Sequence, residues 1–312
     1  MLEFVYSQNE KDEDDMEIRL EVINQHITRD AAAFVAACEH NYWEQVHKIA
    51  DFVKEHHTAR PILLLSGPSG SGKTTTAHLL EHLLEQSGLQ AHTLSMDNYF
   101  IPLTPSQLAD AATALESPDR VDKRLLNEQL QSIFAGQTVD VPTFDFSHNT
   151  RRYHGNTLTR HKDELVILEG IHALNPDVIT LPDETTVRIY ISVRTRLALE
   201  DGSLLHPKWI RLMRRILRDE THRNRTPEHS YEHFDSVNLG EDRYIMPYKP
   251  HAMFDVDTMI PYEIALYRNS LLPKLQTIRN HPGVADMIRF LEQSVSLDKA
   301  LLPHNSLITE FI

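Results

Sequence analysis

The stretch that most constrains this chain reads GPSGSGKT and runs from Gly67 to Thr74. It fits the pattern G-x-x-x-x-G-K-[ST] and lies between the apolar run PILLLS and a stretch with helical periodicity. Glycines let the backbone turn tightly enough for successive N–H groups to point at phosphate oxygens, and the following helix adds the positive end of its dipole. The predicted phosphate-binding loop consists of Gly67, Pro68, Ser69, Gly70, Ser71, Gly72, Lys73 and Thr74.

Two side chains of this loop carry specific expectations. Lys73 should reach the β and γ phosphates of ATP or GTP, and the Thr74 hydroxyl should bind Mg²⁺. The alternative is an ordinary glycine turn followed by a surface lysine. The chain has only ten glycines and three of them lie in this loop, so the pattern does not follow from a glycine-rich composition.

Short apolar runs alternate with helical stretches on both sides of the loop. The runs are PILLLS, AHTLSM, ELVILEG, VRIYISV and DTMIP, and the helical stretches cover 74–86, 123–134 and 207–222. This alternation predicts an α/β fold of the P-loop NTPase kind, a doubly wound parallel sheet whose ligands bind at the carboxyl ends of the strands. The segment from Val139 to Arg160 reads as an inserted β-hairpin.

The sequence divides into three parts. We expect an acidic leader and helical extension over 1–58, a P-loop kinase domain over 59–282, and a C-terminal helix and tail over 283–312. The formal net charge of −14 argues against nucleic acid as a partner, and no apolar run is long enough to span a membrane. The N-terminus lacks the features of a signal peptide, which favours the cytoplasm.

Two acidic residues follow predicted strands at the edge where the loop lies. Glu169 lies at the end of the run ELVILEG and Asp97 follows the run AHTLSM. Glu169 is therefore a candidate magnesium ligand, and Asp97 a candidate base that also helps to order the metal. Without the neighbouring loop, a helix cap or solvated turn would be the commoner explanation of Glu169, and ordinary turn chemistry would explain Asp97 equally well.

Six arginines lie between Arg211 and Arg225, although the chain as a whole is acidic. Several recur at helical spacing, and the guanidinium fork suits phosphate oxygens. We interpret the segment as a helical lid over the triphosphate; a solvated basic helix face remains the alternative. The candidate lid residues are Arg215, Arg218, Arg223 and Arg225.

Taken together, these segments resemble the uridine kinase and phosphoribulokinase superfamily, and most closely its bacterial uridine kinase-like nucleoside kinases. The similarity runs from about Ile49 to Pro261 and rests on GPSGSGKT, SMDNYF, ESPDRVD, VPTFDFSHNTRR, LEGIHALN, RRILRDETHRNR and MPYKPHAMFDVDTMIP. The resemblance implies phosphorylation of a nucleoside 5′-hydroxyl, with uridine or cytidine as acceptor. It also implies a homo-oligomer.

The resemblance assigns a role to individual residues. Asp97, Lys73 and Arg218 fall on catalytic positions, Thr74 and Glu169 on magnesium ligands, and Arg223 and Arg225 on the ATP site. The implied nucleoside-binding residues are Glu116, Phe144, Phe146, His148 and Arg215, to which the turn DNYF adds Tyr99. The family usually has Asp at 116, Tyr at 144 and Gly at 224, and His148 lies one place early, so base selectivity stays open.

Two other functions compete with this interpretation. One is a sugar-phosphate kinase of the phosphoribulokinase type, and the other is a nucleotide-sensing P-loop ATPase without a second substrate. The aromatic residues Tyr99, Phe144 and Phe146 favour a flat nucleoside base over a phosphosugar.

Overall fold

A five-stranded parallel sheet forms the centre of the computed structural model, which describes residues 6–7, 16–104, 107 and 116–312. The strand order is β13-β10-β3-β9-β4, which places the strand before the phosphate loop in the middle. The doubly wound α/β fold is therefore confirmed. The strands are β3 (Ile62–Ser66), β4 (Ala91–Ser95), β9 (Leu165–Glu169), β10 (Thr186–Ser192) and β13 (Phe254–Asp257).

The last predicted strand begins and ends earlier than the run DTMIP suggests. Strand β13 stops at Asp257, whose carboxylate accepts hydrogen bonds from the backbone N–H groups of Arg194, Thr195 and Met259. A carboxylate that satisfies three backbone donors stabilises a turn rather than a further strand residue. The apolar residues Met259 and Ile260 are buried in the loop that follows.

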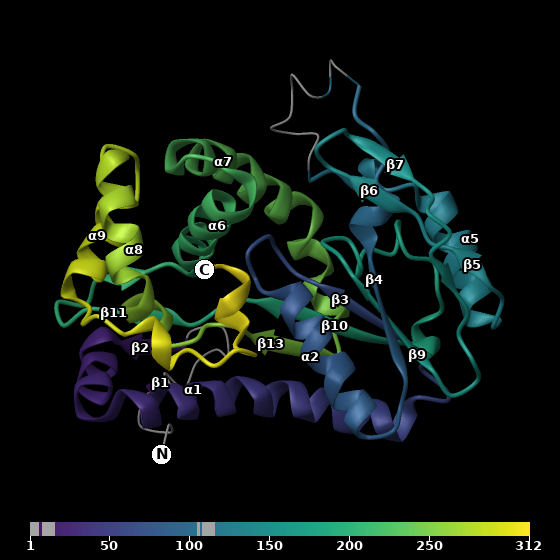
Figure 1. The fold of residues 1–312 in the computed structure, drawn as a ribbon, viewed down its shortest axis with the longest axis horizontal. Coiled ribbons are helices and arrows are strands. Elements are labelled where there is room, and N and C mark those ends of the chain that lie inside the picture. The colour runs from purple at the N-terminus through teal and green to yellow at the C-terminus, as the bar shows by residue number, and fades with distance from the viewer. Residues whose placement is uncertain (1–5, 8–15, 105–106, 108–115) are drawn as a thin grey trace.

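Helices cover both faces of the sheet (Figure 1). Side chains alternate along each strand, so Leu63 and Leu65 join one core while Ile62 and Leu64 join the other. The first core contains α1, α2, α6, α8 and α9, and the second contains α5. The bounds are α1 (Leu20–His56), α2 (Lys73–Gln86), α5 (Lys123–Phe134), α6 (Pro207–Arg223), α7 (Pro227–Tyr244), α8 (Glu263–Thr277) and α9 (Val284–Gln293).

The N-terminal extension is part of the main core over the described residues from 16 onward. Helix α1 buries Phe34, Val46 and Val53 in the same cluster as strand β3, and Figure 1 shows it running along the sheet. It bends at Asp30, whose backbone is not helical and whose carboxylate accepts a 3.0 Å hydrogen bond from the N–H of Ala33. The helical part of the expected extension therefore packs against the sheet of the kinase domain. Residues 1–5 and 8–15 of the expected leader lie outside the described residues.

A second, four-stranded sheet ties this extension to the rest of the molecule. Its order is β1-β2-β11-β12, and β2 pairs in parallel with β11. The strands are β1 (Tyr6–Ser7), β2 (Glu17–Arg19), β11 (Arg196–Ala198) and β12 (Leu204–Leu205).

The predicted insertion is a hairpin with an interruption. Its outer pair joins β5 (Val139–Asp140) to β8 (Thr157–Leu158), and its inner pair joins β6 (Thr143–Asp145) to β7 (Thr150–Arg152). Pro142 lies where the ladder breaks, and it has no backbone N–H to donate.

Short 3-10 turns complete the chain, and the last of them brings the C-terminal residues back to the centre of the molecule (Figure 1). These turns are η1 (Met96–Tyr99), η2 (Pro118–Arg120), η3 (Asp183–Thr185), η4 (Met246–His251), η5 (Lys299–Leu301) and η6 (Leu307–Glu310). Within the described ranges, no helix combines the length and apolarity that crossing a bilayer requires.

Candidate active site

The phosphate loop connects the end of β3 to the start of α2. Gly67 lies so close to β10 that a Cβ there would come within 1.9 Å of the Ile191 carbonyl oxygen. Gly72, at the N-cap of α2, has φ +84°, a left-handed conformation that side chains rarely adopt. Lys73 begins the helix, and its Nζ donates a 3.1 Å hydrogen bond to the Pro68 carbonyl. The loop thus has the geometry that the glycine pattern predicts.

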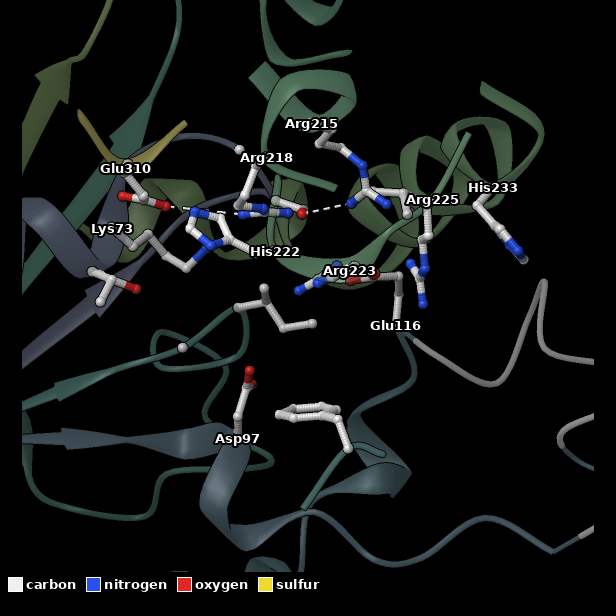
Figure 2. A pocket seen from close by; sticks show the side chains of 18 of the residues that line it. Lys73, Asp97, Glu116, Arg215, Arg218, His222, Arg223, Arg225, His233 and Glu310 are labelled. Atoms are coloured by element: carbon white, nitrogen blue, oxygen red, sulfur yellow. Dashed lines mark hydrogen bonds and ion pairs between the residues drawn. The ribbon is translucent and has the colours of Figure 1, made fainter. Parts of the chain in front are cut away.

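A cavity of about 940 Å³ opens in front of this loop, large enough for a nucleotide and a second small molecule. Segments far apart in the sequence line it: the phosphate loop, the carboxyl ends of β4 and β9, helices α6 and α7, the hairpin and the C-terminal turn (Figure 2). The predicted site residues that line it are Ser69, Gly70, Gly72, Lys73, Thr74, Asp97, Glu116, Phe146, Glu169, Arg215, Arg218, Arg223 and Arg225.

Three predicted acceptor-binding residues do not line this cavity. The Tyr99 ring is fully buried, and its hydroxyl donates to Gln129 because the 3-10 turn η1 rotates it into the core. Phe144 is buried beneath its neighbour Phe146, with ring centroids 5.1 Å apart. His148 is exposed, and its Nδ1 lies 2.8 Å from the Asp145 carboxylate. Gly67, Pro68 and Ser71 likewise lie behind the cavity-lining part of the phosphate loop.

Two carboxylates face the loop from neighbouring strands, and that of Glu169 is buried. Glu169 is the last residue of β9, and Asp97 follows β4, which pairs with β9. Burial raises the pKa of both groups, while the positive charge of Lys73 opposes the shift. With the Thr74 hydroxyl they form an oxygen donor set of the kind that Mg²⁺ prefers.

No cluster of three or more histidine, cysteine or acidic residues suited to a metal occurs in the described part of the chain. Mg²⁺ is usually held by one or two carboxylates together with substrate phosphates, and Asp97 and Glu169 offer two carboxylates at this cavity. The residues therefore fit a nucleotide-borne Mg²⁺ and do not form an all-protein cage.

Helix α6 holds the phosphate loop through its arginines. Arg215 donates a 2.6 Å hydrogen bond to the Ser69 hydroxyl. Arg214 is fully buried, donates a 3.2 Å hydrogen bond to the Gly70 carbonyl and binds both carboxylate oxygens of Glu263 at 2.8 and 2.9 Å. The alternative of a solvated basic face is therefore wrong for this helix.

The cavity also contains a glutamate that helix α7 holds by close packing. Glu116 lies against Gly240, and burial raises its pKa while the charge of Arg215 opposes that shift. Phe146 presents an exposed ring to the same cavity.

The residues that sequence reasoning missed include an arginine and a glutamate that line the cavity. Arg120 is buried, with its guanidinium carbon 4.3 Å from the centre of the Phe100 ring, and its Nε has no hydrogen-bond partner among the described residues. Arg120 lies in the same ESPDRVD segment as Glu116, and this closeness in the sequence could have identified it as a site residue. Glu310 comes from the C-terminal tail, for which the sequence pattern gave no signal.

Comparison with known proteins places this geometry in a family. The sequence model described as Phosphoribulokinase / Uridine kinase family matches residues 62–264. The chain belongs to this family. The resemblance inferred from the seven sequence segments is thereby confirmed.

Individual relatives agree with this assignment. A uridine kinase of Staphylococcus epidermidis is 31% identical over 202 residues, covering 64% of this chain and 86% of that protein. Uridine-cytidine kinase 2-B of Danio rerio is 27% identical over 216 residues, covering 66% and 75%. A putative fructose transport system kinase from Silicibacter sp. TM1040 shares the fold, with a TM-score of 0.51 at 19% identity over 65% of this chain and 94% of that one.

Family membership and fold together establish the class of reaction. This member of the phosphoribulokinase / uridine kinase family is a P-loop kinase, a phosphotransferase with an alcohol acceptor. Its substrates are a nucleotide and a second small molecule.

Proposed function

We propose that the protein transfers the γ-phosphoryl group of ATP, with GTP as a possible second donor, to the 5′-hydroxyl of uridine or cytidine. The observation that carries this proposal is the cavity itself, which is lined by Asp97, by the phosphate-loop residue Lys73 and by the exposed ring of Phe146. The names of the uridine kinase relatives support the same acceptor.

In the proposed reaction Asp97 accepts the proton of the attacking 5′-hydroxyl. The bond from O5′ to the γ phosphorus forms while the bond from that phosphorus to the bridging oxygen breaks, and the electron pair leaves with the diphosphate. Lys73 stabilises the charge that develops on the transferred group. Asp97 is suited to act as a base, because desolvation in the cavity raises its pKa and makes proton acceptance easier than for a fully solvated carboxylate.

Thr74, Glu169 and Asp97 would hold Mg²⁺, which when bound neutralises charge on the β and γ phosphates. Arg218, Arg223 and Arg225 line the same cavity and are suited to phosphate oxygens. In a closed complex they would also exclude water, which otherwise competes with the acceptor for the phosphoryl group.

The acceptor side combines a flat ring with a carboxylate. Phe146 can stack on a nucleobase, and Glu116 can accept hydrogen bonds from sugar hydroxyls. The contact between Glu116 and Gly240 supports this role, because it fixes the carboxylate from behind.

One observation favours a sugar-phosphate acceptor as the second candidate. Arg120 brings a buried cation to the cavity, and an anionic group on the acceptor would pair with it. It also faces Asp97 and Glu116, whose charges it already balances in part. We therefore keep the nucleoside as the first candidate.

A coupled assay that measures ADP release with uridine, cytidine, ribulose 5-phosphate or no acceptor tests the proposal. We expect turnover with uridine or cytidine to exceed the acceptor-free rate by at least about 10²-fold. Faster turnover with ribulose 5-phosphate would replace the nucleoside by a sugar phosphate. Equal ADP release with and without acceptors would indicate an ATPase.

A further inference from the structure

The C-terminal tail forms one wall of the cavity beside the phosphate loop. Turn η6 (Leu307–Glu310) brings Leu307 against the loop, where a Cβ on Gly72 would come within 2.6 Å of Leu307 Cδ1. Leu307, Ile308 and Phe311 are completely buried. The tail therefore packs as part of the core and not as a loose end.

Three further contacts fix the tail in place. The Ser306 hydroxyl donates a 2.6 Å hydrogen bond to Glu39 of α1 and lies 2.9 Å from the Tyr262 hydroxyl. The Phe311 ring lies under the guanidinium of Arg214, 5.0 Å from its carbon, and Arg214 in turn binds the phosphate loop. Removing the tail from this position would require breaking all three contacts.

The tail places one carboxylate in the cavity. Glu310 accepts a 2.6 Å hydrogen bond from the Thr75 hydroxyl and lies 3.9 Å from Arg218. Figure 2 shows Glu310 and Asp97 on opposite sides of Lys73. The positions of Asp97 and Lys73 therefore indicate which part of a bound donor lies near Glu310.

The orientation of the donor follows from the phosphate loop. The γ phosphate must face Asp97, where the acceptor attacks, and Lys73 reaches the β and γ phosphates. The α phosphate and the sugar therefore extend toward the other side, where Thr75 and Glu310 lie. A carboxylate is repelled by phosphate and can only accept hydrogen bonds. The groups of the bound donor that it can bind favourably are therefore the hydroxyls of the sugar.

We propose that Glu310 binds the ribose hydroxyls of the phosphoryl donor, so that the C-terminal tail completes the donor site and selects ribonucleotides over 2′-deoxyribonucleotides. The residue is a specificity determinant of the donor, and its role does not depend on which acceptor is used. Charged hydrogen bonds of this kind change affinity by about tenfold or more.

Calorimetric titration of the full chain with ATP and with 2′-deoxy-ATP, without any acceptor, tests the assignment. We expect the wild type to bind ATP about tenfold more tightly than 2′-deoxy-ATP. In Glu310→Gln this ratio should fall to about two or less, mainly because ATP binding weakens. Glu292→Gln, which neutralises an exposed acid on α9, should keep the wild-type ratio.

A second substitution separates geometry from charge. Glu310→Asp keeps the negative charge beside Arg218 but shortens the reach, so it should also lose the preference for ATP. Thermal unfolding of each variant shows whether it is folded. If Glu310→Gln does not fold, the ATP to 2′-deoxy-ATP ratio of Glu310→Asp tests the proposal instead. An unchanged ATP to 2′-deoxy-ATP ratio in the folded variants would overturn the proposal. Tighter binding of both nucleotides by Glu310→Gln would overturn it too, because Glu310 would then be a competitor of the phosphates.

Discussion

Gly240 of helix α7 lies directly against Glu116: a Cβ on Gly240 would come within 2.3 Å of the Glu116 Cβ. No side chain larger than hydrogen fits there unless Glu116 moves. Gly240→Ala should therefore raise the KM of the acceptor by about tenfold and leave the KM of ATP unchanged, since small displacements of a binding group cost this much or more.

Steady-state kinetics with each substrate varied in turn checks this expectation. Helix stability should not suffer, because alanine is a better helix former than glycine. Leu239→Ala, next to it on the exposed side of α7, is the matched control. An unaltered acceptor KM in Gly240→Ala would show that Glu116 does not contact the acceptor.

Asp97→Asn should lower kcat by about 10² or more while ATP binding stays nearly intact, because the amide keeps an oxygen for Mg²⁺ but cannot accept the proton. Calorimetry gives the ATP affinity and single-turnover kinetics gives the chemical step. Asp163→Asn changes an exposed acid away from the cavity and should behave as wild type. A higher KM with unchanged kcat would identify Asp97 as a binding residue.

Phe146→Ala should raise the acceptor KM by about tenfold, since stacking a base on an aromatic ring contributes about 1–3 kcal/mol. The KM of ATP should hardly change. Tyr153→Ala removes another exposed ring from the insertion that does not line the cavity, and it serves as the control. Equal acceptor KM values for the two variants would argue against a base stacked on Phe146.

Removing residues 1–30 should lower the melting temperature markedly, although the acidic composition of the leader alone gives no sign of this. The deletion removes Ile18, Leu20, Ile23 and Ile27, all of which are buried in the main core. Each buried aliphatic side chain contributes about 1.5–3 kcal/mol. A deletion of residues 1–15 is the comparison, and equal melting temperatures for the two deletions would contradict the packing of α1.

Glu39→Gln should stabilise the protein at neutral pH. Burial raises the pKa of Glu39, and its Oε2 has no hydrogen-bond partner among the described residues. A carboxyl with a raised folded-state pKa stabilises the fold at low pH and loses that contribution as pH rises, because the unfolded chain releases its proton first.

Thermal unfolding of wild type and Glu39→Gln between about pH 4 and pH 7 measures this effect. The melting temperature of the variant should move above that of the wild type as the pH increases. A constant difference across the range would mean that Glu39 titrates as it does in the unfolded chain.

Local patterns predicted the regular elements of the fold well. Helix α5 has the expected bounds, Lys123–Phe134, because its apolar spacing and its Asp122 cap are both local features. Strand β13 was misplaced because apolar content alone cannot distinguish a buried strand from a buried loop. The phosphate loop was predictable because its backbone conformation requires glycines at particular positions, and these are visible in the sequence.

The rest of the site depends on rotations and distant contacts that no local pattern contains. Tyr99 and Phe100 are adjacent, yet the 3-10 turn directs the first into the core and the second into the cavity. Glu310 reaches Thr75 from 235 positions away, which only the packed tail makes possible.

Strand β3 limits how this chain can change over evolutionary time. Its odd and even residues belong to two different cores, and its last residue, Ser66, leads directly into the phosphate loop. Inserting or deleting one residue would exchange the two apolar sets and turn the loop toward the opposite face. Strand β3 can therefore accept substitutions by side chains of similar size, whereas insertions and deletions must occur in the surface loops that connect the elements.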